Sequence, residues 1–572
     1  MDVTSLRAVV QELKSTILPS RFEKAQQPSP QTLQLGWRTV TGLLWLELSW
    51  HGDCPRLVRI NSPDRLGESS TLAQQLQHGL RQMALVHLEQ QGFERVVQFG
   101  LAPRLGNLVE RWLVLELMGR HSNLLLLDRQ RRIIAIGRRV REHQSRVRPI
   151  GTGDIYTPPP PLKGLMPNAY ETVACWRAHL KLLPINLYQS LQQTYQGISP
   201  SLALQLTGEE TKAARALLET PVTDLTSNQW QYVYRRWSIW LGYWQHGKFR
   251  IYHSGPTPYR VWLATEDNAS TPEAEDEGIA LALGAYYRHE LNNRALLRKA
   301  DAMGQRLCRL QEKEEKACHE QKQRLAATKE ADKFQQQADA LLCVIRPSKK
   351  EIGAAQALYR RARRLRRAVT VLEGRLQHHQ DRLRVIQNGC AFLEGLMSTD
   401  WEDSDQRLKQ LQDLQEELEK LLGQVARLEQ YRQKVGQRRT EISSPLELKT
   451  IGGLRLQVGR NHRQNDWISL RQARSGDLWF HAQECSGSHV VLKASEGLAQ
   501  DGDLQLAADL AAYFSRARGN IRVPIVVAPT EQLQRIAGSA PGTVRHRGGS
   551  VRWGEPDRGQ KQLHQLVSLV SK

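Results

Sequence analysis

Apolar residues at alternating spacings of three and four run through the middle of this 572-residue chain and restrict its fold more than any other feature. This spacing keeps one apolar stripe along a helix and is typical of helices that pack as a coiled coil. The central seam comprises Val369, Leu372, Leu376, His379, Leu383, Ile386, Cys390, Leu393 and Met397, and the period recurs within 296–310 and 411–428. Pro347 breaks the pattern because the residue before a proline disfavours helix, and residues 401–405 interrupt the returning arm. The sequence therefore predicts an antiparallel hairpin of two long arms rather than a parallel homodimeric coil.

Close to the expected turn of this hairpin, six arginines fall within eight residues. They are Arg360, Arg361, Arg363, Arg364, Arg366 and Arg367. On a helix they surround nearly the whole circumference, and no acidic residue follows until Glu373, so pairing along one face does not explain them. A phosphate backbone would relieve their mutual repulsion, with release of its counterions. We therefore expect RNA contact at this arginine block; the alternative is a solvated charged helix.

The overall composition favours a polyanionic partner and gives no support to an enzyme. Lys and Arg total 80 against 59 Asp and Glu, a formal net charge of +21 that attracts nucleic acid or an anionic membrane surface. No apolar run approaches the roughly 18 residues of a membrane-spanning helix, and the first residues lack a signal-peptide pattern. The phosphate-loop, dinucleotide-binding, nucleophile-elbow and zinc-protease motifs are all missing. We expect no catalytic residues, no metal, no cofactor and no membrane partner.

The cysteines point to a reducing compartment. All seven are scattered and never spaced as CxxC: Cys54, Cys175, Cys308, Cys318, Cys343, Cys390 and Cys485. This pattern argues against a disulfide framework or a zinc knuckle. We therefore expect a cytoplasmic protein whose thiols are buried or lie in the helical seam.

The regions on either side of the arms combine helix and strand signals, which predicts an α+β multidomain fold. Residues 1–165 alternate short apolar strands with turns and end in a run of prolines. Residues 166–235 are helical and contain the turn GISP (197–200), whose glycine permits a tight bend and whose proline restarts a helix. Strand-like residues return within 236–284, the arms occupy 285–440, and a region of strands with one helix occupies 445–572.

Two unusual strings near opposite ends of the chain place Arg, His, Ser and Asn beside apolar strands, as surfaces that bind phosphate and ribose do. In the first, ELMGRHSNLLLLD (116–128), the candidates are Gly119, Arg120, Ser122 and Asn123. Arginine can form a bidentate contact with phosphate; the alternative is a plain β-turn. In the second, DLWFHAQECSGSHVVLK (477–493), the candidates are Trp479, His481, Ser488 and His489. An aromatic beside histidine can stack on bases, although a strand tryptophan is more often part of the core.

Together with GISP, AAQALYRRARR (354–364) and GRNHRQNDWISL (459–470), these strings resemble the NFACT family, earlier described as fibronectin-binding-protein-A-like. The resemblance runs in order over nearly the whole chain. It implies a glycosylase-like, β-rich NFACT-N domain at 1–165 with return strands from 236–284, and a helix-hairpin-helix region at 166–235. It further implies a long antiparallel coiled-coil middle domain with a basic tip at 285–440, and an α+β NFACT-R RNA-binding domain at 445–572.

The resemblance also implies a cytosolic ribosome quality-control factor. Such proteins bind large ribosomal subunits obstructed by peptidyl-tRNA, recruit aminoacyl-tRNA and support template-free addition of C-terminal residues, chiefly alanine in bacteria. The tail marks the nascent chain for degradation, and peptide transfer itself belongs to the ribosome. The implied partners are therefore large-subunit rRNA, tRNA and the obstructed nascent-chain peptidyl-tRNA, with a monomer acting on the ribosome.

The family's tRNA contacts map onto an early acidic residue, Asp2, and onto an Asp-Arg pair that is Glu94 and Arg95 here. Glutamate keeps the charge but extends it by one methylene, so the tRNA selected need not be the family's alanyl-tRNA. We expect tRNA at these three residues and at the four candidates of the 116–128 string. We expect ribosomal RNA at the arginine block and at the four candidates of the 477–493 string.

Two other functions start from the same resemblance. A DNA glycosylase or lyase is disfavoured, because Asp2 stands where those enzymes have a Pro-Glu nucleophile pair. A surface adhesin, as the older family description suggests, is disfavoured by the missing signal peptide and by the arginine block.

Overall fold

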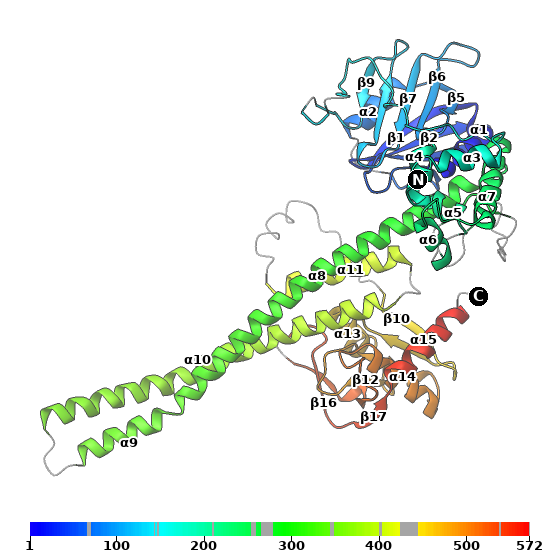
Figure 1. Ribbon diagram of the computed structural model, residues 1–572. Coiled ribbons are helices and arrows are strands. Elements are labelled where there is room, and N and C mark those ends of the chain that lie inside the picture. The colour runs from blue at the N-terminus through cyan, green and yellow to red at the C-terminus, as the bar shows by residue number, and fades with distance from the viewer. Residues whose placement is uncertain are drawn as a thin grey trace. The chain divides into compact units, whose positions relative to one another are not determined.

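The computed structural model describes the chain except residues 66–69, 142, 146–147, 209–210, 253–258, 265–277, 344–347, 400–402, 424–443, 537–538 and 571–572. It divides into two compact units, Met1–Arg288 and His289–Lys572, which we describe in turn (Figure 1). Each unit combines helices with antiparallel sheet, so the predicted α+β fold class with a β-rich start is confirmed.

The first unit is built on a nine-stranded antiparallel sheet in the order β4-β3-β2-β1-β5-β6-β7-β8-β9. Its strands are β1 (Ser20–Ser29), β2 (Thr32–Thr39), β3 (Gly42–Ser49), β4 (Arg56–Ile60), β5 (Ala84–Gln90), β6 (Val96–Ala102), β7 (Arg111–Glu116), β8 (Asn123–Leu127) and β9 (Ile133–Ile136). Two residue pairs, Ser20 with Leu85 and Arg21 with Ala84, join β1 to β5, so a short ladder links two halves of the sheet. Strand β8 is buried on both faces, which explains its unbroken run of leucines.

Two helices pack on this sheet. Helix α1 (Val3–Ile17) contacts β5 and β4, and α2 (Thr71–Gly79) contacts β1 and β9. Asp2 caps α1, because its Oδ1 accepts a hydrogen bond from the backbone N–H of Ser5 at 2.8 Å. The buried stripe of α1 includes Leu6, Val9, Val10 and Leu13.

Five helices follow the sheet: α3 (Val173–Leu180), α4 (Leu187–Thr194), α5 (Pro200–Leu206), α6 (Lys212–Glu219) and α7 (Ser227–His246). They share a tryptophan-rich core that includes Trp176, Trp230, Trp237 and Trp240. The GISP turn lies between α4 and α5, and Pro200 is in the first turn of α5, as predicted. Gly197 has a φ of +78°, and a Cβ there would lie 3.2 Å from Val3, so this bend requires glycine.

Among the described residues, the return strands predicted within 236–284 do not join the nine-stranded sheet. The second half of α7 and the start of α8 (Ile279–Thr328) occupy the two ends of this range. Among the described residues between them, strand pairing is limited to one bridge from Tyr252 to Arg260. The physical reason is packing, since Trp262 and its neighbours insert into the tryptophan-rich core of the helices instead of extending the sheet.

The second unit begins with long helices: the rest of α8, then α9 (Ala331–Leu342), α10 (Lys349–Met397) and α11 (Ser404–Leu421). Arg366 of α10 lies 2.8 Å from Asp332 of α9. Farther along α10, Arg382 lies 2.9 Å from Glu314 of α8. Because higher residue numbers on α10 meet lower numbers on α8 and α9, the arms are antiparallel, as predicted. Pro347 at the expected turn lies outside the described residues.

Helix α11 joins the hairpin and completes an apolar core. Buried members of this core are Leu296 and Leu307 of α8, Ile386 and Leu393 of α10, and Leu411 and Leu418 of α11. Asn292 of α8 is hydrogen bonded to Asp405 of α11. Since Arg306, farther along α8, pairs with Glu419 at 3.2 Å, α11 runs parallel to α8. The predicted seam positions beyond residue 423 lie outside the described residues, as do residues 401–402 of the interruption predicted at 401–405. The rest of that stretch contains the start of α11 at Ser404.

The second unit ends in a six-stranded antiparallel sheet in the order β10-β11-β13-β12-β14-β17, with a separate ribbon of β15 and β16. The strands are β10 (Leu446–Lys449), β11 (Arg455–Val458), β12 (Leu478–Ala482), β13 (Val490–Leu492), β14 (Val523–Pro529), β15 (Leu533–Arg535), β16 (Val544–His546) and β17 (Ser550–Gly554). Helices α14 (Asp501–Tyr513) and α15 (Pro556–Val570) pack on one face of the sheet. On the other face, the turn η2 (Trp467–Arg471) and the ribbon pack around Trp479. No stretch of the described helices combines length with the apolarity that crossing a bilayer requires.

Candidate nucleic-acid interface

All six arginines of the arginine block lie on α10 and are exposed to solvent. The buried residues of α9 and of the adjoining part of α10 are alanines: Ala331, Ala338, Ala355 and Ala362. Because small side chains occupy the contact, the two helices can approach closely and the long guanidinium side chains remain outside. The six arginines are therefore accessible, which the predicted RNA contact requires and which the alternative of a solvated helix also fits.

The opposite arm supplies an acid that the sequence pattern did not reveal. Arg366 pairs with Asp332 at 2.8 Å and donates a second hydrogen bond to Gln335 at 2.6 Å. Arg361 lies over the ring of Phe334, with its Cζ 4.4 Å from the centroid. The inference that no nearby acid pairs with this block is thus wrong for Arg366, because Asp332 is distant in sequence but adjacent across the hairpin.

The charge of the arginine block nevertheless persists. The Arg366–Asp332 pair is exposed on both sides, and such pairs contribute only about 0–1 kcal/mol. Four members have no ion pair with the described residues: Arg360, Arg363, Arg364 and Arg367. Unpaired guanidinium groups at this density repel one another and favour a phosphate backbone as a partner.

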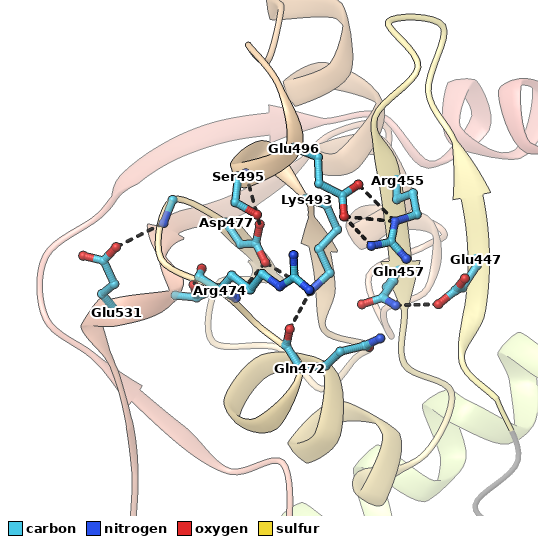
Figure 2. A network of polar contacts seen from close by, with 12 residues as sticks. Glu447, Arg455, Gln457, Gln472, Arg474, Asp477, Lys493, Ser495, Glu496 and Glu531 are labelled. Carbon is cyan, nitrogen blue, oxygen red and sulfur yellow. Dashed lines mark hydrogen bonds and ion pairs between the residues drawn. The ribbon is translucent and has the colours of Figure 1, made fainter.

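The 477–493 string is held by an ion pair between its two ends. Asp477 Oδ2 lies 3.1 Å from Lys493 Nζ, and both side chains are almost completely buried (Figure 2). Lys493 also donates to the carbonyl of Gln472 at 3.1 Å, and Ser495 donates to Asp477 Oδ1 at 2.6 Å. Burial alone would raise the pKa of Asp477, but the hydrogen bonds it accepts, that from Ser495 first, hold this pKa below its usual value.

Further polar contacts surround this pair and fix the adjoining strands and turns. Arg455 of β11 pairs with Glu496, and Gln457 donates to Glu447 on the neighbouring strand β10 (Figure 2). Glu531 accepts a hydrogen bond from the backbone N–H of Gly476 at 3.1 Å. The charged residues of this region therefore stabilise the fold of the C-terminal sheet.

Within the string, the predicted RNA contacts are mostly buried. Trp479, Ser488 and His489 are 3%, 2% and 3% exposed, and only His481 is half-buried. Trp479 stacks on His481 with 5.4 Å between ring centroids, and His489 meets the same indole edge-on. Trp479, Ser488 and His489 are therefore corrected to buried positions. The η2 turn and the ribbon cover Trp479, Ser469 of η2 meets His489, and the backbone N–H of Ser488 donates to the carbonyl of Phe514 at 3.0 Å.

The histidines of this cluster are neutral at physiological pH. Burial lowers the pKa of His481 to about 4 and lowers the pKa of His489 well below its usual value. His489 Nδ1 is 2.8 Å from Ser469 Oγ, which fixes the orientation of its ring. Among the described residues, no three His, Cys, Asp or Glu side chains are placed to hold a metal ion.

An exposed basic and aromatic surface lies close to this buried cluster. The ribbon carries Arg535, Arg545 and Arg547, all exposed, and the edge strand β17 exposes 56% of Trp553. The sequence analysis missed this surface. A usable signal was present in VRHRGGSVRW (544–553), where basic residues alternate with apolar and aromatic ones.

In the 116–128 string, the structure separates one exposed side chain from two buried ones. Ser122 and Asn123 are each 1% exposed. Ser122 Oγ accepts from the Met118 N–H at 2.8 Å, and Asn123 Nδ2 donates to the Arg138 carbonyl at 2.8 Å. Both residues are therefore corrected from RNA contacts to parts of the turn, because the neighbouring backbone uses their polar atoms.

The turn itself, η1 (Gly119–His121), presents Arg120 to solvent. Gly119 has a φ of +56°, a left-handed conformation that glycine adopts without strain. Arg120 Nε donates a hydrogen bond to His121 Nε2 at 3.2 Å. The Arg120 side chain forms no ion pair with the described residues. Of the four candidates in this string, Arg120 has the exposure that a phosphate contact requires.

The other candidates for tRNA contact lie near the start of the chain. Asp2 and Arg95 both act on the amino group of Met1: burial lowers its pKa most, Asp2 raises it and Arg95 lowers it. The charges of Asp2 and Arg95 therefore both lie close enough to this amino group to shift its pKa. Glu94 is half-buried, and its Oε1 accepts a hydrogen bond from the backbone N–H of Leu162 at 2.9 Å. Gln90 Nε2 donates to the carbonyls of Val3 and Glu94, at 3.4 Å and 3.0 Å, so the start of the chain lies close to the segment of Glu94 and Arg95.

Comparison with known families identifies both ends of the chain. Residues 2–352 match the model described as NFACT N-terminal and middle domains. Residues 448–548 match the model described as NFACT protein RNA binding domain.

Comparison with individual proteins gives the same picture over nearly the full length. The Rqc2 homolog RqcH of Streptococcus suis (strain 05ZYH33) is 24% identical over 572 residues, which cover 95% of this chain and 96% of that protein. The Rqc2 homolog RqcH of Bacillus subtilis (strain 168) is 23% identical over 563 residues, 94% of each chain. Among solved structures, the N-terminal part of the fibronectin/fibrinogen-binding protein from Streptococcus suis is 21% identical, with a TM-score of 0.40, and the match covers 50% of this chain and 99% of that one.

Proposed function

This chain belongs to the NFACT family, and from that premise we propose that it is a ribosome-associated quality-control factor that acts by binding RNA. The family match supplies the class of function. The observation that carries the proposal within this molecule is the arginine block, whose exposed guanidinium groups are largely without acidic partners.

On this proposal, the hairpin and the C-terminal sheet bind ribosomal RNA. The exposed cations of α10 and of the β15–β16 ribbon would contact phosphates, and such contacts position a protein without reading sequence. Trp553 adds an exposed ring on which a base can stack. Each phosphate contact would make the affinity fall as salt rises.

The finer part of the proposal concerns tRNA and the nascent chain. The protein would bind large subunits obstructed by peptidyl-tRNA, recruit an aminoacyl-tRNA and support template-free addition of C-terminal residues to the stalled chain. Asp2, Arg95 and Arg120 would contact this tRNA: Arg120 is exposed, and the partly exposed Asp2 and Arg95 both lie near the Met1 amino group. Glu94 would act mainly by positioning the segment at Leu162.

No protein nucleophile is needed for this function, because peptide transfer would take place in the ribosome. The work of this chain is therefore to bind two RNA molecules at the same time. In physical terms, it replaces a chance encounter of tRNA and subunit by an intramolecular one.

The test uses the full chain and purified large ribosomal subunits. Co-sedimentation over a series of salt concentrations should show that the logarithm of the association constant falls linearly with the logarithm of the salt concentration. Sequencing of RNA cross-linked to the protein in cells should recover both rRNA and a restricted set of tRNAs. Salt-independent binding, or none, would overturn the proposal. The lyase alternative would be revived by a covalent adduct with an abasic duplex under reducing conditions that trap Schiff bases.

A further inference from the structure

A cleft of about 370 Å³ lies in the second unit, where α10, α11 and the loop between β15 and β16 meet. Its polar lining comes from all three segments: His378, Arg384 and Asn388 of α10, Lys420 of α11, and Ser539 and Thr543 of the loop. None of these residues belongs to the arginine block or to the 477–493 string. The cleft is thus a separate feature of the molecule.

The loop that forms one wall is anchored at two points. Ala540 packs against the apolar core shared by α8, α10 and α11. The backbone N–H of Gly542 donates to Asp466 Oδ1 at 3.3 Å, and Gly542 has a φ of +73°. A Cβ at this glycine would lie 2.9 Å from the carbonyl oxygen of His462. Residues 540–542 of the loop are therefore seated against both the helical arm and the short helix α13 (His462–Asp466), and the cleft is a built element of the fold.

The charged side chains that line the cleft differ in whether they already have a partner. Arg384 and Lys420 are exposed, and neither forms an ion pair with a described residue. Arg382 is occupied, because it donates to Glu314 and to the Leu422 carbonyl, each at 2.9 Å. Asp381, the acid in the lining, accepts a hydrogen bond from Gln377 at 3.0 Å. Two cations thus face the opening with hydroxyl and amide donors beside them.

This combination suits a phosphate group. Lysine and arginine supply the charge, and the hydroxyls of Ser539 and Thr543 supply neutral donors such as those that contact nucleic-acid backbones. The loop also leads directly into the β15–β16 ribbon, with Arg535 on one strand and Arg545 on the other. A backbone that follows the exposed cations of the ribbon would reach the cleft at its end.

We propose that this cleft binds a phosphate of an RNA backbone, so that the helical arm and the C-terminal sheet engage the same strand together. The inference rests on the proposed function and deepens it by assigning a contact outside the arginine block. An RNA seated here would bridge Lys420 and Arg384 of the arm to the loop of the sheet. The loop position would then be coupled to RNA binding.

The test compares two double variants of the full chain with equal changes in charge. Arg384→Glu with Lys420→Glu alters the cleft, whereas Arg375→Glu with Lys409→Glu alters exposed cations elsewhere on the same two helices. Affinity for a single-stranded RNA of mixed sequence is measured over a series of salt concentrations. The cleft variant should bind roughly 10-fold more weakly, with a salt slope smaller by about 1–2, while the control stays within about twofold of wild type. Thermal unfolding of both variants checks that the fold is intact.

The outcomes separate this inference from the proposed function. If wild type binds RNA and both double variants bind it equally well, the cleft assignment alone is overturned. If wild type itself binds no RNA, the proposed function is overturned and the cleft site with it. Inorganic phosphate is added as a competitor at constant ionic strength to distinguish a free ion from a backbone. Displacement of RNA by phosphate from wild type, but not from the cleft variant, would support a backbone phosphate in the cleft. Phosphate binding that the cleft variant loses, with RNA affinity equal in the two double variants, would overturn the backbone assignment in favour of the free ion.

Discussion

The arginine block on α10 and the 477–493 string were both predicted to bind RNA, yet they differ in solvent exposure. The block remains exposed on every one of its six arginines, whereas Trp479, Ser488 and His489 are buried. The difference follows from chemistry. A dense group of guanidiniums cannot be desolvated without partners, while an indole and neutral imidazoles gain free energy when a turn and a ribbon cover them. A charge cluster is therefore a safer indication of a binding surface than an aromatic motif.

The largest effect is expected at the buried ion pair of the string. Replacing Lys493 with Met leaves the Asp477 carboxylate buried without its ammonium partner, and should lower the free energy of unfolding of the second unit by about 3 kcal/mol. Arg455→Gln is the matched control, since its pair with Glu496 is more exposed and solvent screening makes such a pair contribute far less to stability. Denaturant unfolding followed by circular dichroism measures both. Equal losses would show that burial does not distinguish these pairs.

The next largest effect is expected on binding to large ribosomal subunits, and it tests the exposed arginine block. Changing Arg360, Arg361, Arg363 and Arg364 to Glu should weaken co-sedimentation with large ribosomal subunits about 100-fold while the protein stays folded. A control with the same charge change replaces other exposed cations of the hairpin: Arg309, Lys313, Lys316 and Arg324. Binding should fall far less in this control. If the two variants lose affinity equally, net charge rather than the block governs binding.

A pH titration probes the histidines of the buried string. The pKa of His481 is about 4 in the folded protein and near its usual value of 6.5 when unfolded, so the unfolded state binds the proton more tightly. Stability should therefore be complete above about pH 6.5 and decline toward pH 4, with His481 contributing on the order of 2 kcal/mol. His481→Gln should reduce this decline, leaving the part due to His489. An unchanged pH profile would contradict the burial of this ring.

The smallest effect concerns the first unit and extends the comparison to tRNA. Replacing Glu94 and Arg95 with Ala should lower tRNA co-purification roughly 10-fold and leave large-subunit binding unchanged. The matched control is Ser122→Ala, which removes a buried hydroxyl of the turn and should act on stability only. Sequencing of the bound RNA gives both readouts. Persistent tRNA binding by the double variant would place the tRNA contact elsewhere.

Much of the fold was predictable because its signals are local. The three-four periodicity determined the long helices, and GISP determined the bend before α5. The described residues of the predicted return strands do not extend the sheet, because apolar residues near Trp262 suit a strand and a helical core equally well, and only packing chooses between them. The candidate site was predicted less well, because it is formed by residues that are far apart in the sequence. Asp332 pairs with Arg366 across the hairpin, and Ser539 lines the same cleft as Arg384 and Lys420.

By itself, the sequence determined the helical arms, their antiparallel reversal, the excess of positive charge and the family to which the chain belongs. Tertiary structure alone decided which candidates reach solvent. It turned Ser122 and Asn123 inward, covered Trp479 and built a cationic cleft from segments that no motif connects. The physical reason is that helix periodicity and charge are properties of neighbouring residues, whereas solvent exposure depends on which distant segments pack against each side chain.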